Sequence, residues 1–280
     1  MNIKHKIGFV TCVDLGKSCL QAIYQEGYKV DIAITLKDKN AKNKSGRAYI
    51  DDLCHENNTN LFKVDHINDE ESLEFIQSHD LDILFVIGWS QLLSKQVIDS
   101  VRDIYGMHPT LLPMGRGRAA IPWTILKKLK YSGVSLFRIE EEVDSGALIL
   151  QEKFKIEEKI NATELYQLSK DAHVRLIKRA LPMLSKNEIK EIKQNTEKIS
   201  YWPQRKPDDG LINLDGSIYE AELLIRAVTK PYPGAFFFEK EKKIIVWKSK
   251  VLKSKKNIKE NQKVLRFFDG LLLLEDFDIE

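Results

Sequence analysis

The chain has 280 residues, of which 43% are hydrophobic and 30% are charged, a composition that excludes a disordered protein and one built of membrane spans. Its formal net charge of +3 argues against a dedicated non-specific nucleic-acid binder, although a local basic patch is compatible with it. Three unclustered cysteines (Cys12, Cys19 and Cys54) indicate free thiols in a reducing compartment. The apolar run near the N-terminus is too short for a signal peptide or a membrane span, so we expect a cytoplasmic protein.

Strands and helices alternate in the prediction for the first part of the chain. The run Leu81–Gly88 is continuously apolar, as expected of a central strand covered on both faces. Three shorter apolar runs precede it, at residues 6–12, 30–36 and 61–64. The segments between these runs have apolar residues at helical spacing, so we expect helices there. We therefore predict an α/β fold with a Rossmann-like, mostly parallel sheet flanked by helices. The first turn has no G-x-G-x-x-G motif, which disfavours a dinucleotide ligand.

The later part of the chain predicts a second, smaller region. Strands are expected at residues 133–139 and 147–156, and Asn161 with Glu164 forms a capping box that opens a long helix ending at Pro182. His173 on this helix is interpreted as a structural or surface histidine. A polar, proline-rich link follows Tyr201, so we divide the chain into a domain of residues 1–200 and a small, mostly β C-terminal subdomain of residues 201–280.

The segment Tyr105–Trp123 holds the first candidate for chemistry. Pro109 restricts His108 to an extended conformation, so this histidine is held in place. The following glycines allow close approach of the backbone, and Arg116 and Arg118 can make bidentate contacts to phosphate or carboxylate. A surface loop with a satisfied histidine and solvated arginines would carry the same residues, so this segment alone leaves both interpretations open.

Asp144 is the expected partner of His108. Both residues follow strands that we expect to be adjacent and parallel, and the loops after such strands share one edge of a sheet. An aspartate beside a histidine fixes its tautomer and favours its use as a base. The sequence has no G-x-S-x-G nucleophile motif, which favours direct transfer between bound substrates. From the residues alone, this indicates acyl or phosphoryl transfer to an amine or hydroxyl.

These two segments resemble a known family. Tyr105–Trp123, together with Val143-Asp144-Ser145-Gly146, is similar to the signature of formyltransferases that use 10-formyltetrahydrofolate. This family includes methionyl-tRNA formyltransferases and nucleotide-sugar N-formyltransferases, and the chain is most like the latter. The resemblance extends in order from about residue 6 to residue 250, with further motifs at Tyr201-Trp202-Pro203, Ile225–Thr229 and Pro231–Ala235.

The resemblance implies a site as well as a fold. His108 and Asp144 would carry a direct transfer through a tetrahedral intermediate, with 10-formyltetrahydrofolate as cosubstrate and no metal. The implied folate contacts are Leu84, Phe85, Val86, Ile87, Gly88, Trp89, Ile139 and Val143. The implied contacts to the acceptor substrate are Met107, Pro109, Thr110, Gly117, the candidate diphosphate ligands Arg116, Arg118 and Arg226, and the candidate stacking residues Trp123, Tyr201, Trp202 and Tyr232. Trp123 and Trp202 could equally be core residues.

One position departs from the family pattern. The family has an asparagine two residues before the histidine, and this chain has Gly106 there. Loss of one oxyanion donor typically costs on the order of 3 kcal/mol of transition-state stabilisation. We expect Ser90, Gln91, Thr110 or a water molecule to take over this role; the alternative is that catalysis is lost.

Three functions follow from the resemblance. The first is formylation of a nucleotide-linked amino sugar for surface polysaccharides, favoured by the small C-terminal subdomain and the modest net charge. The second is methionyl-tRNA formylation, with the basic segment 37–47 and the lysine-rich C-terminal region as RNA contacts. The third is folate binding without catalysis, motivated by Gly106. We expect neither a membrane nor a nucleic acid as partner, and exposed C-terminal strands would allow a homodimer.

Overall fold

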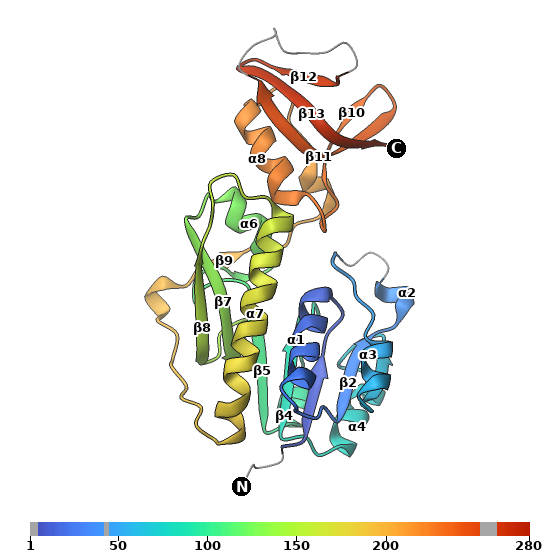
Figure 1. Cartoon of the computed structure of the whole chain (residues 1–280), viewed down its shortest axis with the longest axis vertical. Coiled ribbons are helices and arrows are strands. Elements are labelled where there is room, and N and C mark those ends of the chain that lie inside the picture. Colours follow the sequence, from blue (N-terminus) through green and yellow to red (C-terminus); the bar gives the residue numbers. More distant parts are fainter. Residues whose placement is uncertain (1–4, 42–44, 253–261) are drawn as a thin grey trace. The chain divides into compact units, whose positions relative to one another are not determined.

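The structure is a computed structural model that describes residues 5–41, 45–252 and 262–280 (Figure 1). These residues form two compact units. The first unit contains the chain up to residue 117 together with residues 132–154 and 168–201. The second contains residues 118–131, 155–167 and 202 onwards. Because two earlier segments belong to the second unit, the functional division into residues 1–200 and 201–280 stays a prediction.

The first unit is built on a seven-stranded sheet with the order β3-β2-β1-β4-β5-β7-β8. Strands β1 to β5 pair in parallel, and β7 runs antiparallel to β5. The sheet confirms the predicted Rossmann-like, mostly parallel fold. Its strands are β1 (Ile7–Val10), β2 (Ile32–Leu36), β3 (Asn60–Val64), β4 (Ile83–Ile87), β5 (Asp103–His108), β7 (Tyr131–Arg138) and β8 (Leu148–Lys155).

Helices cover both faces of this sheet (Figure 1). On one face, α1 (Asp14–Gln25) and α7 (Ala162–Ser185) are joined by two ion pairs, Lys170 to Asp14 and Lys178 to Glu26, each with an N···O distance of 2.9 Å. On the other face, α4 (Glu70–Ser78) and α5 (Lys95–Asp99) pack through Ile76 and Val97 onto strand residues that include Leu84, Val86 and Ile104. The short helices α2 (Asp38–Ala41) and α3 (Asp51–Glu56) complete this part.

The long helix α7 begins as predicted but ends later. The Asn161 backbone amide donates to the Glu164 carboxylate, and the Glu164 amide donates to the Asn161 side chain, which confirms the capping box. Pro182 lies inside the helix, so the prediction that it ends the helix was wrong. Burial of Leu184 accounts for the extra turn, because this side chain is only 6% exposed. His173 is buried and its Nδ1 lies 2.7 Å from the Ser169 carbonyl, as expected of a structural histidine.

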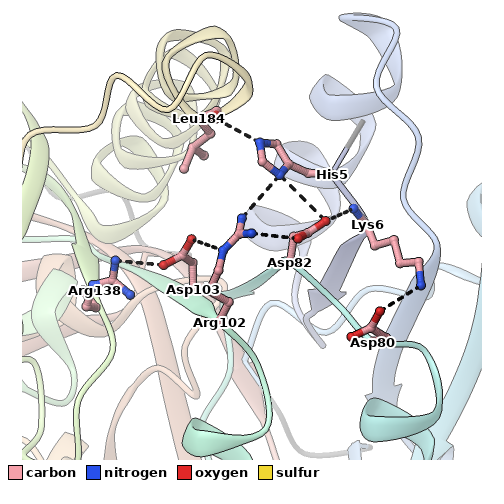
Figure 2. Close-up of polar contacts among 8 residues, drawn as sticks. All are labelled: His5, Lys6, Asp80, Asp82, Arg102, Asp103, Arg138 and Leu184. Atoms are coloured by element: carbon pink, nitrogen blue, oxygen red, sulfur yellow. Dashed lines mark hydrogen bonds and ion pairs between the residues drawn. The ribbon is translucent and has the colours of Figure 1, made fainter. Parts of the chain in front are cut away.

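A network of charged side chains lies at the edge of the sheet where the parallel strands begin (Figure 2). We call it the amino-edge network; its members are His5, Lys6, Asp80, Asp82, Arg102, Asp103 and Arg138. Asp82 accepts from the Lys6 amide at 2.8 Å and from Arg102 Nη1 at 2.9 Å. Asp103 accepts from Arg102 Nε at 3.2 Å and from Arg138 Nη2 at 2.9 Å. These bonds tie together the starts of β1, β4 and β5 and the end of β7.

The second unit contains a four-stranded antiparallel sheet with the order β10-β11-β13-β12. Helix α8 (Ile218–Val228) packs on this sheet and on α6 (Ala120–Leu126). The Ser217 hydroxyl caps α8, and Asp269 accepts from the Ile218 amide at 2.9 Å. The predicted mostly β C-terminal part is thus confirmed as an open sheet, with strands β10 (Ala235–Glu239), β11 (Lys242–Leu252), β12 (Val264–Phe267) and β13 (Gly270–Ile279).

The remaining elements are short: β6 (Arg116–Gly117), β9 (Tyr201–Trp202) and the 3-10 turns η1 (Thr196–Lys198) and η2 (Pro207–Gly210). No helix in the described part of the chain is long and apolar enough to cross a bilayer.

Candidate active site

His108 is the last residue of β5, and its ring is held from both sides. The side chain is 10% exposed. Its Nε2 lies 2.7 Å from the Gly115 carbonyl oxygen. Because a carbonyl can only accept a hydrogen bond, Nε2 carries a proton and donates it. Nδ1 then faces the Asp144 carboxylate, with Oδ2 3.5 Å away. The structure therefore brings together the two residues that the sequence paired.

Asp144 is held in an unusual backbone conformation. Its φ is +52°, in the left-handed region that few side-chain-bearing residues adopt. Its Oδ2 accepts from the Gly117 amide at 2.8 Å. Strained positions of this kind persist only where their surroundings enforce them, and they cluster at functional sites. The side chain is 14% exposed, so the carboxylate and the imidazole face each other largely shielded from water.

The route by which Asp144 reaches His108 differs from our prediction. We expected both residues to follow parallel strands, but β7 is antiparallel to β5, with Arg138 opposite Tyr105 and Ser135 opposite His108. The chain therefore leaves β7 at the edge where β5 begins, and the segment 139–146 brings Asp144 back to the end of β5. The predicted pair meets, but the reason given for it was wrong.

Gly106 has a local structural explanation. It lies on β5 two residues before His108, so both point to the same face of the sheet. A Cβ at position 106 would stand 3.0 Å from the Phe137 ring and 3.1 Å from the Ile139 side chain. Ile139 thus takes the space above position 106, and a larger residue there requires both neighbours to shift.

Two of the residues expected to replace the missing oxyanion donor, Gln91 and Thr110, differ in whether their polar groups are already hydrogen-bonded. Gln91 uses both ends of its amide elsewhere: Oε1 accepts from the Ile67 amide at 2.8 Å and Nε2 donates to the Asp65 carbonyl at 3.0 Å. The Thr110 hydroxyl is buried and finds no hydrogen-bond partner among the described residues. Of these two, Thr110 has the free donor.

The predicted folate contacts on β4 have side chains that lie in the core. Leu84, Phe85 and Ile87 are fully buried, and Val86 is 7% exposed, because they form the central strand of the core. A cavity of about 700 Å³ lies beside α5 and the segment after β7. Its lining combines the apolar Ile98, Val101, Ile104 and Ile139 with charged residues that include Arg102.

Arg116 was predicted to bind a diphosphate, and the structure places its guanidinium inside the protein. Its side chain is 3% exposed and every part of the guanidinium is engaged. Nε and Nη2 donate to Gln194 Oε1 at 3.2 and 2.8 Å, and Nη1 donates to Glu142 Oε1 at 3.4 Å and to the Tyr201 hydroxyl at 3.1 Å. Met107 is buried, and strand alternation directs its side chain to the face of the sheet opposite His108.

The other predicted substrate contacts differ in how deeply their side chains are buried. Trp202 is 7% exposed and belongs to the core, whereas Tyr232 is half-buried. Within the second unit, Trp123 is half-buried, with its indole N–H donating to the Pro203 carbonyl and Arg205 lying over its ring. Arg226 lines a separate cavity of about 690 Å³, but its guanidinium already contacts Glu222 and the Ile160 carbonyl.

The chain belongs to the formyltransferase family. Residues 10–181 match the family model for formyl transferase, and residues 205–275 match that for the formyl transferase C-terminal domain. This family assignment agrees with the resemblance of the sequence motifs. In the described part of the chain, no group of three or more histidine, cysteine or acidic residues is arranged to hold a metal ion.

Individual relatives are consistent with this family. The chain is 33% identical over 248 residues to the bifunctional polymyxin resistance protein ArnA of Wigglesworthia glossinidia brevipalpis, covering 88% of this chain and 37% of that protein. It is 29% identical to methionyl-tRNA formyltransferase of Clostridioides difficile, covering 98% and 92%. The N-formyltransferase of Helicobacter canadensis, solved with folinic acid and dTDP-3-aminofucose, shares the fold, with a TM-score of 0.70, 18% identity and coverage of 98% and 100%.

Proposed function

We propose that this protein transfers a formyl group from 10-formyltetrahydrofolate to the amino group of a nucleotide-linked amino sugar, with His108 and Asp144 as the catalytic pair. The observation that carries the proposal is the shielded pair itself. Nδ1 of His108 and Oδ2 of Asp144 lie 3.5 Å apart, and their side chains are 10% and 14% exposed. A histidine fixed by a carboxylate is the usual arrangement for moving a proton to or from a reacting group.

A cavity that extends from the amino-edge network to the residues beside Asp144 is the proposed folate site. The cavity of about 700 Å³ is lined by four apolar residues, Ile98, Val101, Ile104 and Ile139, and by eight polar or charged ones, among them Arg102, Arg138, Glu142 and Ser145. Apolar surface for a ring system, together with polar groups that fix its orientation, is typical of small-molecule sites. Ile104 lies on the same face of β5 as His108. The folate supplies the formyl group when bound, and these residues would hold its ring system.

The hydrogen bonds of the His108 ring support one route for the proton. Nε2 of His108 donates to the Gly115 carbonyl, so Nδ1 is the nitrogen that accepts a proton from the attacking amine. The resulting imidazolium is stabilised by the nearby Asp144 carboxylate. Asp144 itself is fixed by the Gly117 amide, so its charge needs no rearrangement when the imidazole becomes protonated.

An amino-sugar acceptor is supported by one structural neighbour and by the described surface charges. The Helicobacter canadensis enzyme was solved with a dTDP-linked amino sugar. In the basic segment 37–47, Lys37 and Lys39 both pair with Asp65, and the Arg47 side chain is only 8% exposed. Residues 42–44 of this segment, and residues 253–261 of the lysine-rich C-terminal region, lie outside the described residues.

Methionyl-tRNA formylation is the second candidate. The Clostridioides difficile relative carries that name, and the match covers nearly the whole length of both chains. The third candidate, folate binding without catalysis, is motivated only by Gly106.

A single assay separates the three. The purified protein is incubated with 10-formyltetrahydrofolate and either dTDP- and UDP-linked amino sugars or methionyl-tRNA, and the products are analysed by mass spectrometry. We expect one added formyl group on an amino sugar, and no product with the His108→Ala variant. Formylation of methionyl-tRNA alone, with affinity that falls steeply with salt, would establish the second candidate. Folate binding without any product would establish the third.

A further inference from the structure

The segment Gly115-Arg116-Gly117 contacts both members of the proposed catalytic pair. The Gly115 carbonyl accepts from His108 Nε2 at 2.7 Å, and the Gly117 amide donates to Asp144 Oδ2 at 2.8 Å. The residue between them, Arg116, directs its side chain into the protein. The position of Arg116 therefore determines where both backbone contacts lie.

Gln194 links Arg116 to the backbone around Asp144. Its Oε1 accepts from Nε and Nη2 of Arg116, at 3.2 and 2.8 Å. Its Nε2 donates to the carbonyls of Asp144 and Gly146, each at 2.8 Å. A primary amide has one oxygen and two N–H groups, and here all of them are used. Gln194 is 9% exposed, so water competes little for these bonds.

The two N–H bonds of Gln194 act where the backbone is strained. Asp144 has a φ of +52°, and the two carbonyls that Gln194 binds are its own and that of Gly146 two residues later. Position 146 admits only glycine, since a Cβ there would stand 1.9 Å from the Arg138 carbonyl oxygen. Gln194 thus holds the turn that places the Asp144 carboxylate beside His108.

We propose that Gln194, anchored by Arg116, is a positioning residue for the transfer reaction, acting through the backbone of Asp144. This inference rests on the proposed function, because it assigns Gln194 a role only through the His108–Asp144 pair. Gln194 touches neither His108 nor any reacting atom. A shift of about 1 Å in a catalytic group can cost about a hundredfold in rate, so a residue that holds the Asp144 turn affects kcat without contacting substrate.

Two substitutions separate positioning from general stability. Gln194→Met has similar size but removes all four hydrogen bonds. Gln194→Glu keeps an oxygen acceptor for Arg116, and with it the anchor, but removes the N–H donors to Asp144 and Gly146. A Gln194 whose role is limited to anchoring Arg116 would tolerate glutamate, because the bond to the buried arginine is strengthened by charge. A positioning Gln194 would not.

Thr59→Val is the matched control for loss of buried hydrogen bonds. The Thr59 hydroxyl donates to the Val30 carbonyl at 2.9 Å and contacts the Tyr24 hydroxyl at 2.6 Å. Thr59 is 7% exposed, belongs to the same unit as Gln194, and lines neither cavity. This variant reports what a comparable loss of buried bonds does to the enzyme in general.

The experiment measures kcat, KM, melting temperature and the pH profile of kcat for the full-length variants with the acceptor found in the assay above. We expect kcat of both Gln194 variants to fall about 30- to 100-fold, with KM for folate and acceptor within about threefold of wild type. Gln194→Glu should melt within about 3 °C of wild type, and the acidic limb of its kcat profile should shift to lower pH, since the charge pair is weakened. Thr59→Val should keep kcat within about twofold.

The outcomes are distinguishable from a failure of the proposed function. If His108→Ala is inactive while Gln194→Glu keeps wild-type kcat and pH profile, the inference about Gln194 is overturned and the catalytic pair stands. If His108→Ala retains wild-type activity, the proposed pair itself is wrong. Equal loss of kcat in Gln194→Glu and Thr59→Val would also overturn the inference, because it would assign the loss to stability alone.

Discussion

The first unit carries a polar network at each edge of its sheet, and the two are built differently. At the amino edge, Asp82, Asp103, Arg102 and Arg138 are 21–55% exposed and connect through ion pairs (Figure 2). At the other edge, His108, Asp144, Arg116 and Gln194 are 14% exposed or less. There, backbone amides and carbonyls supply many of the contacts.

This difference in burial predicts a difference in role. Exposed ion pairs are screened by water and salt, and each contributes little to stability. Buried hydrogen bonds to the backbone are directional and costly to leave unmade, so they fix the orientation of a side chain. The amino-edge network therefore joins strand ends, whereas the contacts around His108 and Asp144 hold two groups in one geometry.

An aspartate can be replaced by asparagine at either edge, and the largest effect on kcat is expected for Asp144→Asn. Asp144→Asn keeps an oxygen that can accept from the Gly117 amide but removes the negative charge beside His108. We expect kcat to fall on the order of 10³-fold, within the range for loss of general acid-base assistance. Steady-state kinetics at saturating substrates measure this. A variant with kcat close to wild type would show that the carboxylate charge is not needed.

Two glycine substitutions test whether geometry at the Asp144 edge matters beyond stability. Gly117 has a φ of +108°, and Gly27, at the end of α1, has a φ of +80° with nothing within 4 Å of an added Cβ. Both changes to alanine should lower the free energy of unfolding by about 1–3 kcal/mol. Only Gly117→Ala should lower kcat, by about tenfold or more, because the Gly117 amide holds Asp144. Urea unfolding and kinetics on both variants check this; equal kcat would contradict it.

A buried histidine on α7, His173, predicts how stability depends on pH. Burial lowers the pKa of His173 to about 4 from its usual 6.5. The folded protein therefore keeps it neutral where the unfolded chain takes up a proton. The stability contributed by the neutral ring is complete above pH 6.5 and is lost as the pH falls from 6.5 towards 4. From pH 7 to pH 5 we expect a loss of about 2 kcal/mol.

His173→Leu is the matching variant for this pH dependence. It removes the titrating group, so the part of the loss between pH 7 and pH 5 that comes from His173 should disappear. Urea unfolding at the two pH values, for wild type and variant, measures the difference. An unchanged pH dependence in the variant would assign the effect to other groups.

The smallest effect is expected for Asp82→Asn in the amino-edge network. This change weakens contacts to Arg102 and to the Lys6 amide, but all of these groups are partly solvated. We expect the free energy of unfolding to fall by less than about 1 kcal/mol, with a smaller difference at high salt. We expect kcat to be unchanged. A large loss of kcat in this variant would remove the distinction between the two edges.

Much of the fold was predictable from local patterns. Apolar runs located the strands because a buried strand needs apolar side chains whatever its neighbours are. The predicted central strand Leu81–Gly88 contains β4, and the capping box at Asn161 and Glu164 forms as expected. These features depend on contacts between residues close in the sequence, so the sequence shows them directly.

The site was less predictable because it depends on contacts between distant residues. The apolar run of β7 reads the same for a parallel or an antiparallel strand, and only the sheet shows that the chain leaves it at the opposite edge. Arg116 has the residue type of a phosphate ligand, but its partner Gln194 is 78 positions away and carries no motif. Leu84 to Ile87 were assigned to a ligand by resemblance, yet a central strand buries such side chains in the core.

By itself, the sequence determined the alternation of strands and helices, the formyltransferase family and the identity of the two central residues, His108 and Asp144. Short-range periodicity and motif order suffice for these. The tertiary structure decided that the segment after β7 returns Asp144 to His108 and that Ile139 fills the space above Gly106. It also decided that the buried side chains of Arg116 and Gln194 hold the backbone around this pair. Those arrangements depend on strand direction and on packing between segments far apart in the chain, which no local pattern encodes.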